Sequence, residues 1–337
     1  MPAVRSNYSL ASHNSFKLKV STKYYVECQG IDDLQEFLGS ETYSRHPLLV
    51  LGEGSNILFT RDFPGTVLRP LFCSIEITEE SGTDVVIRAG AGINWDELVE
   101  WTVSRNYWGL ENLSLIPGSA GAAPIQNIGA YGTEIREHIA SVEAVDLKTG
   151  STKIFANPDC RFSYRYSIFK EPSQKDYLVS HISLKLSKNP VPRLGYGNLK
   201  DELPSGREPG IRDIRDAVIR IRRRKLPDPA RTGNAGSFFK NPVIPVAAFR
   251  ELVAAWPGIP SYPAEPGYCK VPAAWLIQEC GWKGRRIGNA GTHPEQALVI
   301  VNHGEATGKE ILEFSGRIEE DVRSRFGICL EKEVILI

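Results

Sequence analysis

The chain has 337 residues, with 40 basic and 40 acidic side chains and 42% hydrophobic residues. This length favours two or three domains with an ample core. Zero net charge gives no general attraction to nucleic acid or to an anionic membrane, so we expect a small-molecule partner. The six cysteines include no Cys-x-x-Cys pair, which argues against a metal site or a disulfide framework and favours a reducing compartment. We predict a cytoplasmic protein, because neither a secretory signal nor a membrane-spanning stretch is recognisable.

Strand patterns dominate the first part of the chain. Alternating apolar and polar residues predict a strand at 17–29, which leads into a short helix at 31–38. Residues 48–51 are predicted as a short buried strand, and further strands are predicted at 57–59, 66–68 and 85–89. A helix from 94 to about 105 begins at a capping box, Asn94 to Glu97. A Lys-Thr-Gly turn joins strands 141–147 and 152–155 into a hairpin, and a strand at 177–186 follows.

Helical patterns dominate the second part. After a Pro- and Gly-rich linker at 187–210, we predict helices at 211–225, 245–256, 273–280 and 307–326, and a strand at 331–337. Ile211, Ile214, Val218 and Ile221 form the apolar stripe of the first of these helices. The basic run 222–225 is therefore interpreted as the solvated end of an amphipathic helix, and a nucleic-acid patch is the less favoured alternative.

The stretch 116–132 is the most unusual part of the chain. It is uncharged, rich in Gly and Ala, and interrupted by two prolines, so it suits neither a helix nor a strand. Its glycines permit positive φ and close backbone approach, and its small side chains leave peptide N–H groups accessible to a phosphate. Such an irregular backbone needs partners when buried, and a bound ligand would supply them. A packing loop between two elements explains the stretch equally well.

Two further runs have a similar composition. Residues 52–56, Gly-Glu-Gly-Ser-Asn, lie between two short strands and offer backbone N–H groups, a hydroxyl and an amide, although an ordinary hairpin turn is the simpler explanation. Residues 233–242 present Ser237 from a Gly-rich turn, without the Gly-x-Ser-x-Gly pattern of a serine hydrolase. Rossmann and P-loop motifs are absent from the sequence. These features alone indicate an α+β protein with two glycine-rich cradles and identify no reaction.

Five segments taken in order carry a resemblance to a known family: 51–56, 116–132, 164–170, 236–242 and 330–334. Together they resemble the UDP-N-acetylenolpyruvoylglucosamine reductases, also called UDP-N-acetylmuramate dehydrogenases, across nearly the whole chain. The resemblance implies an α+β, FAD-binding fold of the vanillyl-alcohol oxidase-like type. It also implies two FAD subdomains, 1–71 and 72–210 with 322–337, and an inserted α+β substrate domain, 211–321.

The resemblance further implies the reaction. The family reduces the enolpyruvyl ether of a UDP-sugar to a lactyl ether, giving UDP-N-acetylmuramate for peptidoglycan synthesis, with FAD as cofactor and NADPH as hydride donor. Hydride would pass from NADPH to flavin N5 and then to the vinyl carbon, and the resulting enolate must be stabilised and protonated. The implied partner is a small molecule, with no nucleic acid and no membrane, and we expect a monomer.

Motif positions imply the roles of individual residues. Ser237 would be the proton donor, Arg165 a cation near the substrate carboxylate, and Glu333 a group that polarises the enolic intermediate. Taken singly, these three also fit a turn hydroxyl, a loop ion pair and a solvated strand end. The residues implied to hold FAD are Gly52, Gly54, Ser55, Asn56, Ile116, Pro117, Gly118, Ser119, Gly121, Ile125, Gln126, Asn127, Gly129, Ala130 and Tyr131. Those implied to contact the substrate are Tyr196, on a mobile loop, and Lys225, Asn241, Lys270 and Gln296.

The chain departs from the family pattern in two places. Residues 119–123 read Ser-Ala-Gly-Ala-Ala where many members have Thr or Cys, Val and two Gly, and Glu53 stands where Gly is often found. Both changes keep small residues where the backbone would approach the flavin most closely. They therefore leave the prediction of flavin binding unchanged and put in doubt only how the protein adjusts the properties of the flavin.

Two other functions remain open at this stage. A flavin oxidase of the same fold would often carry a covalent His or Cys linkage, and neither cradle contains His or Cys. A non-catalytic nucleotide-sugar binding protein would be yellow without bleaching in NADPH.

Overall fold

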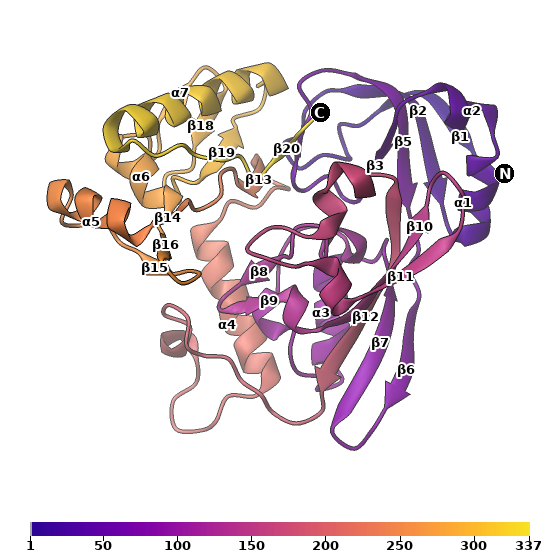
Figure 1. Cartoon of the computed structure of the whole chain (residues 1–337), viewed down its shortest axis with the longest axis horizontal. Helices are drawn as coiled ribbons and strands as arrows, with labels where there is room; N and C mark the ends of the chain where they lie inside the picture. Colours follow the sequence, from indigo (N-terminus) through magenta and orange to yellow (C-terminus); the bar gives the residue numbers. More distant parts are fainter. Residues whose placement is uncertain (1) are drawn as a thin grey trace. The chain divides into compact units, whose positions relative to one another are not determined.

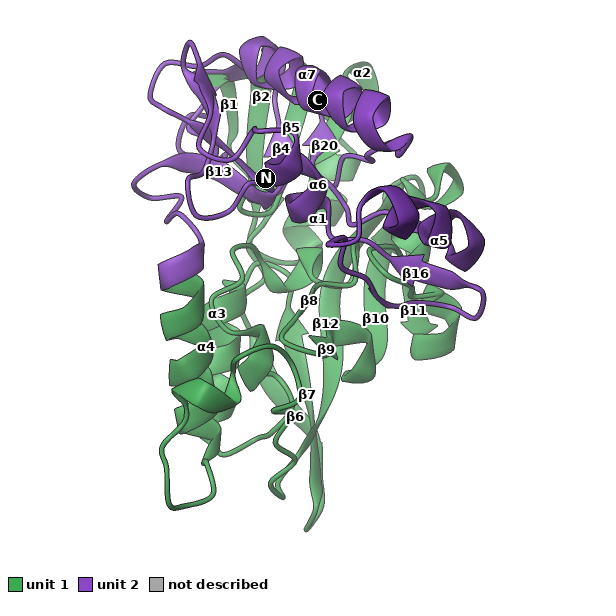
Figure 2. Cartoon of the chain, turned by 90° about the vertical axis from the view of Figure 1, so that its left-hand side faces the viewer, with its two compact units in different colours: residues 1–8, 22–53, 64–223 green, residues 9–21, 54–63, 224–337 purple. Residues whose placement is uncertain are grey.

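The computed structural model describes residues 2–337, which form a mixture of helices and strands (Figure 1). They fall into two compact units, coloured separately in Figure 2. Unit 1 comprises the chain up to Tyr8, Thr22–Glu53 and Pro64–Arg223, and unit 2 comprises Ser9–Ser21, Gly54–Phe63 and Arg224–Ile337. The helices are α1 Ile31–Leu38, α2 Glu41–Arg45, α3 Trp95–Val103, α4 Ile211–Lys225, α5 Val246–Ala255, α6 Ala273–Glu279 and α7 Gly308–Phe326.

Two sheets form the framework of unit 1. One has the order β1-β2-β5-β3, in which β3 and β5 are parallel. The other has the order β11-β10-β12-β7-β6 and is antiparallel. A short ribbon, β8-β9, spans the end of the Gly-rich loop, because β8 lies within residues 116–132. The strands are β1 Val4–Ser9, β2 Ser21–Cys28, β3 Leu48–Val50, β5 Phe63–Pro70, β6 Ile75–Glu80, β7 Asp84–Gly90, β8 Gly129–Ala130, β9 Thr133–Glu134, β10 Ile139–Asp146, β11 Thr152–Ala156 and β12 Tyr177–Ser187.

Helices α3 and α4 share one core with the five-stranded sheet. The predicted apolar stripe of α4 is buried in this core together with Leu98 of α3 and Ile182 of β12. A second cluster joins Leu34 and Phe37 of α1 to Leu68 of the first sheet and to residues of β10 and β12. The Gly-rich loop, which follows α3 in the chain, is therefore attached to a well-packed layer.

Unit 2 is organised around α7 and a sheet of order β13-β19-β18-β17. The predicted stripe of α7 is buried, and the predicted capping box between Thr307 and Glu310 is present. The ring of Phe314 meets Trp282 edge-on, with centroids 5.2 Å apart. The strands are β4 Ile57–Leu58, β13 Gly233–Ser237, β14 Val243–Pro245, β15 Tyr262–Pro263, β16 Tyr268–Lys270, β17 Arg286–Ile287, β18 Ala290–Thr292, β19 Val299–Asn302 and β20 Ile335–Leu336.

Several expectations about secondary structure were wrong. The turn 52–56 does not close a hairpin, because β3 pairs with β5 while β4 pairs with β20, both in parallel. The predicted final strand 331–337 is regular only at Ile335–Leu336, and its earlier part makes an isolated bridge between Lys332 and Phe239. Strands β1 and β6 were missed. Most of their side chains are exposed, β1 shows no alternating apolar pattern, and the alternation in β6 is confined to Ile75 and Ile77.

The two units also differ from the predicted division at 71, 210 and 321. Most of α4 belongs to unit 1, because its apolar stripe is buried against α3 and the five-stranded sheet. The C-terminal segment belongs to unit 2, because β20 pairs with β4. The assignment of FAD and substrate roles to these parts stays a prediction.

Gly308→Ala should destabilise the protein, because a Cβ at Gly308 would lie 1.8 Å from the carbonyl oxygen of Phe59. Overpacking against backbone should lower the free energy of unfolding by about 2 kcal/mol. Gly316 of the same helix faces open space, so Gly316→Ala should raise that free energy by up to about 1 kcal/mol through helix propensity. Urea unfolding of both variants tests the pair, and equal midpoints would contradict the packing argument.

Candidate active site

The first half of the Gly-rich loop is hydrogen-bonded to segments that precede it in the chain. The N–H groups of Ala120 and Gly121 donate to the carbonyls of Ile93 and Ala91, at 2.8 and 3.0 Å. The N–H of Gly118 donates to the carboxylate of Glu53, at 3.2 Å. The expectation that this loop presents a row of accessible N–H groups was therefore wrong for these three residues. Their small size serves close packing, since a Cβ at Gly121 would lie 2.5 Å from that of Ala91.

The two cradles predicted from the sequence meet at Gly52 and Ser119, both in unit 1. A Cβ on Gly52 would lie 2.5 Å from the hydroxyl of Ser119 and 4.0 Å from the Cβ of Ala122. Ser119 is only 6% exposed. The hydroxyl of Ser119 therefore occupies the space that a larger residue at position 52 would need, and the small size of Gly52 lets the two cradles pack together. Their role in holding the pyrophosphate of FAD stays a prediction.

The second half of the loop is held by side chains from 163–167. The hydroxyl of Ser167 donates to the carbonyl of Ile125 at 2.6 Å. The guanidinium of Arg165 donates to the carbonyls of Asn127 and Gly129 at 3.0 and 2.9 Å. Asn127 is fully buried and has a positive φ of 46°. Apart from the two-residue strand β8, this part of the loop is consequently fixed by hydrogen bonds to its carbonyls rather than by regular secondary structure.

Arg165 itself has an unusual backbone. Its φ is 105°, which a residue with a side chain adopts only when its surroundings compensate. Its carbonyl accepts a hydrogen bond from Lys170 Nζ at 3.1 Å. Strain at a motif arginine is compatible with a functional role.

Tyr196 lies beside the end of the Gly-rich loop. Its ring is 6.2 Å from that of Tyr131, edge-on, and a Cβ added to Gly132 would be 3.3 Å from the Cβ of Tyr196. The side chain is 50% exposed. The structure thus brings one predicted substrate residue next to a predicted cofactor residue within unit 1.

In unit 2 the structure brings Ser237 and Glu333 onto adjacent segments. The N–H of Glu333 donates to the carbonyl of Phe238, which follows Ser237, at 2.9 Å. The carbonyl of Glu333 accepts from the amide of Asn56 at 3.1 Å, and the N–H of Ile335 donates to the carbonyl of Asn56. Asn56, Ser237 and Glu333, which are far apart in the sequence, therefore belong to one small cluster.

Glycines with positive φ lie close to two members of this cluster, Gly236 next to Ser237 and Gly54 near Asn56. Strand β13 is irregular between Asn234 and Ser237, where Gly236 has a φ of 67° and donates its N–H to the side chain of Asn234. Gly54 has a φ of 66°, and a Cβ there would lie 2.1 Å from the carbonyl oxygen of His13. Only glycine is compatible with that position.

Three of the other predicted substrate residues of unit 2 lie on the segment 237–243 or beside it, and the fourth lies at the end of α4. Asn241 accepts the N–H of Ala273 at 2.9 Å, at the start of α6. Lys270 is paired in register with Val243 and with Tyr262. The carbonyl of Gln296 accepts the N–H of Val299, the register partner of Ser237. Lys225 is exposed at the end of α4.

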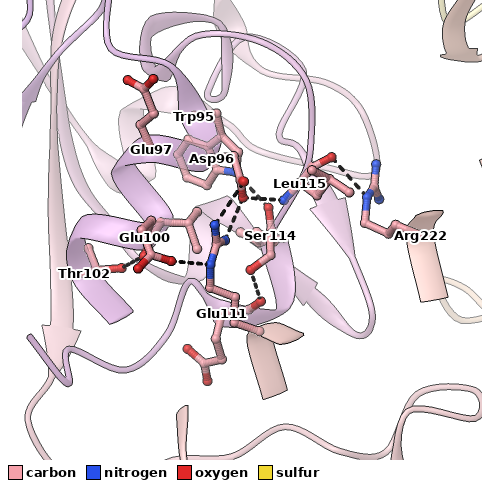
Figure 3. A network of polar contacts seen from close by, with 12 residues as sticks. Trp95, Asp96, Glu97, Glu100, Thr102, Glu111, Ser114, Leu115 and Arg222 are labelled. Carbon is pink, nitrogen blue, oxygen red and sulfur yellow. Dashed lines mark hydrogen bonds and ion pairs between the residues drawn. The ribbon is translucent and has the colours of Figure 1, made fainter. Parts of the chain in front are cut away.

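A charged network between α3 and α4 was missed by the sequence reasoning. Arg215 is only 6% exposed and donates to both carboxylate oxygens of Asp96, at 2.7 and 3.0 Å, and to Glu100 at 2.7 Å. Asp96 also accepts the N–H of Leu115 (Figure 3). Burial opposes ionisation of Asp96, but the hydrogen bonds from Arg215 and Leu115 outweigh it and hold the pKa of Asp96 below its ordinary value. The capping-box pattern had indicated only the cap, which the side chain of Asn94 provides.

Comparison with known proteins identifies the family. Residues 228–337 match the UDP-N-acetylenolpyruvoylglucosamine reductase C-terminal domain, and residues 22–155 match an FAD binding domain. A UDP-N-acetylenolpyruvoylglucosamine reductase of Bacteroides fragilis (strain YCH46) is 42% identical over 336 residues, which are 99% of this chain and 100% of that protein. The chain belongs to the UDP-N-acetylenolpyruvoylglucosamine reductase family.

Two further members of this reductase family agree with the assignment. The reductase of Chromobacterium violaceum is 41% identical over 336 residues, 99% of this chain and 98% of that protein. The crystal structure of the Thermus caldophilus reductase covers 100% of this chain and 98% of its own, with a TM-score of 0.69 at 24% identity, and therefore shares the fold. The predicted α+β fold and FAD cofactor are confirmed, and the protein is an FAD-dependent oxidoreductase. Among residues 2–337, every helix is too short or too polar to cross a membrane.

Glu111, next to the loop, gives a pH prediction. Its carboxylate is 2% exposed and accepts the N–H of Gly109 at 2.7 Å, and burial raises the pKa of Glu111 above its ordinary value of 4.5. This carboxyl stabilises the folded state fully below pH 4.5, and that contribution is lost as the pH rises through the folded pKa. We expect Glu111→Gln to raise the melting temperature at pH 7 and to lose this advantage toward pH 4. Calorimetry measures the difference, with the exposed Glu79→Gln as control, and a pH-independent difference would contradict the prediction.

Proposed function

We propose that this FAD-dependent reductase uses NADPH to reduce the enolpyruvyl ether of UDP-N-acetylglucosamine enolpyruvate to UDP-N-acetylmuramate, a peptidoglycan precursor. The observation that carries the proposal is the 42% identity to a UDP-N-acetylenolpyruvoylglucosamine reductase over 99% of this chain and 100% of that protein. The hydrogen bond from the N–H of Glu333 to the carbonyl of Phe238 supports it, because the segments of Ser237 and Glu333 are adjacent. A monomeric enzyme acting in the cytoplasm is part of the same proposal.

FAD, when bound, supplies hydride transfer to an alkene carbon. We propose that Gly52, Ser119 and the surrounding loop residues hold its pyrophosphate. The proposal is supported by the contact that joins the two Gly-rich segments at these positions and by the match of residues 22–155 to an FAD binding domain. Asn127 and Gly129, whose carbonyls are fixed by Arg165, would then orient the peptides that line the flavin ring. Preorganised peptide groups act without reorganisation during the reaction.

Ser237 is our candidate for the proton donor. Reduction of the vinyl group leaves negative charge on the carbon next to the carboxylate, and that carbon must receive a proton. A hydroxyl is a weak acid, so it donates only to a strong base held at about 3 Å. The irregularity of β13 and the positive φ of Gly236 turn the backbone at Ser237, which supports a presented hydroxyl.

Glu333 and Arg165 complete the proposed chemistry. Glu333 is half-buried beside the strand that carries Ser237, where a carboxylate could polarise or hold the enolic form. Arg165 stays our prediction for the cation that pairs with the substrate carboxylate, supported by its fixed guanidinium in unit 1.

The UDP-sugar would be bound by the side chains that follow Ser237 in the chain or pair with that segment, and by Tyr196. Lys225 and Lys270 supply positive charge suited to a diphosphate, and Asn241 and Gln296 supply amide groups. The aromatic ring of Tyr196, half-exposed beside Tyr131, supports a role for its loop in covering a bound substrate.

Ser237→Ala should separate the two half-reactions. Loss of the hydroxyl should leave bleaching of the 450 nm flavin band by NADPH within about twofold of wild type, because proton donation to carbon is not needed there. Reoxidation of the flavin by the enol ether should slow by about 10²- to 10⁴-fold, the usual range for a positioned acid. Stopped-flow absorbance measures both rates.

Ser237→Cys is the matched variant, since its thiol retains a dissociable proton and should recover part of the second rate. Equal loss of both rates in Ser237→Ala would argue against the proton-donor role. Wild-type protein that is yellow but not bleached by NADPH would indicate a non-catalytic binding protein. Flavin that is reduced by another substrate and reoxidised by oxygen in turnover would indicate an oxidase.

A further inference from the structure

Leu115, the residue that opens the Gly-rich loop, has a left-handed backbone. Its φ is 58°, a conformation that is unfavourable for leucine and is retained only when the surroundings hold it. Both of its peptide groups are bonded. Its N–H donates to Oδ1 of Asp96 at 2.5 Å, and its carbonyl accepts from Nε of Arg222 at 3.2 Å (Figure 3).

Asp96 is itself fixed from a different element. It lies in the first turn of α3, and both of its carboxylate oxygens accept hydrogen bonds from Arg215 of α4, in a bidentate arrangement. Arg215 is buried, and its Nε is occupied by Glu100. The carboxylate that receives Leu115 therefore has little freedom to move.

The same turn of α3 holds two other points of the loop region. The indole of Trp95 donates to the carbonyl of Leu113, and the N–H of Trp95 donates to the carbonyl of Gly118, both at 2.9 Å. The side chain of Asn94 donates to Glu53 at 2.8 Å, and Glu53 in turn accepts the N–H of Gly118. Residues 94–96 thus contact the chain at three positions between Leu113 and Gly118.

We propose that Asp96 is a positioning residue for FAD: it holds Leu115 in the left-handed conformation and so presets the loop 116–121 before the cofactor binds. This inference rests on the proposed function, in which that loop and Gly52 hold the FAD pyrophosphate. A loop that is already ordered binds its ligand more tightly, because its backbone loses conformational entropy on folding and loses little more on binding.

Asp96→Ala tests the inference by FAD titration of the apoprotein. Removal of a charged hydrogen-bond acceptor should weaken FAD binding by about tenfold, measured from the quenching of flavin fluorescence. In the apoprotein without FAD, hydrogen exchange at Leu115 and Gly118 should become faster than in wild type. Arg212→Ala is the matched control, because Arg212 joins the same two helices through Glu100 without contacting Leu115. Its FAD affinity and loop exchange should equal those of wild type.

Two more variants separate positioning from general stability. Asp96→Asn keeps an oxygen that accepts the N–H of Leu115, so its FAD affinity should lie between those of Asp96→Ala and wild type, and it supplies the measurement if Asp96→Ala does not fold. Leu115→Gly, added to Asp96→Ala, should recover part of the lost affinity, because glycine adopts positive φ without strain.

Unchanged FAD affinity in folded Asp96→Ala or Asp96→Asn would overturn the inference, as would equal weakening in Arg212→Ala. Failure of wild-type protein to bind FAD would contradict the proposed function instead. The hydrogen-exchange comparison would then still decide whether Asp96 presets the loop.

Discussion

The structure depends on how it satisfies the peptide groups of an irregular, buried loop. A helix or strand pairs its own N–H and C=O groups, but residues 115–132 do so only locally, and each remaining group needs a partner from elsewhere. The start of α3 supplies acceptors and donors for the first half. Arg165 and Ser167 supply donors for the second half. The small residues of the loop make these contacts feasible, because larger side chains would separate the backbones.

Arginine carries much of this pairing. Arg165 and Arg222 donate to backbone carbonyls, and Arg215 fixes the carboxylate that receives a backbone N–H. The planar guanidinium offers several donors in fixed directions, so one side chain holds two points of an irregular chain. The basic end of α4 therefore has two parts. Arg223, Arg224 and Lys225 are exposed as expected for a solvated helix end, whereas Arg222 is turned toward Leu115.

The sequence was informative where a structural signal is local. The apolar stripes of α4 and α7 follow helical spacing, and both are buried. The Lys-Thr-Gly turn correctly predicted the β10–β11 hairpin. The same local reasoning predicted a capping box from Asn94 to Glu97 and gave Asp96 no role of its own, since nothing near it in the sequence indicates that its carboxylate binds Leu115 and Arg215. The partner of β3 was likewise not evident from the sequence. Its parallel pairing with β5 joins residues that are about 18 positions apart, and a local apolar pattern does not identify such a partner.

The cluster of Ser237, Glu333 and Asn56 contains residues that the family resemblance, and not a hydrophobic pattern, assigned to the site. Its geometry arises from the C-terminal segment, which bonds at Glu333 to Phe238 and continues as β20 beside β4. A hydrophobic period does not predict that the C-terminal segment contacts both the segment of Asn56 and that of Ser237. The family motifs, in contrast, include all three of these segments. Strand β20 has only two residues, but hydrogen bonds beyond it extend the contact with the segment after Asn56. The N–H of Ile337 donates to Leu58, and its carbonyl accepts from the N–H and hydroxyl of Thr60. The backbone of Glu333 is therefore held at two points, because its N–H donates to Phe238 and its carbonyl accepts from the side chain of Asn56.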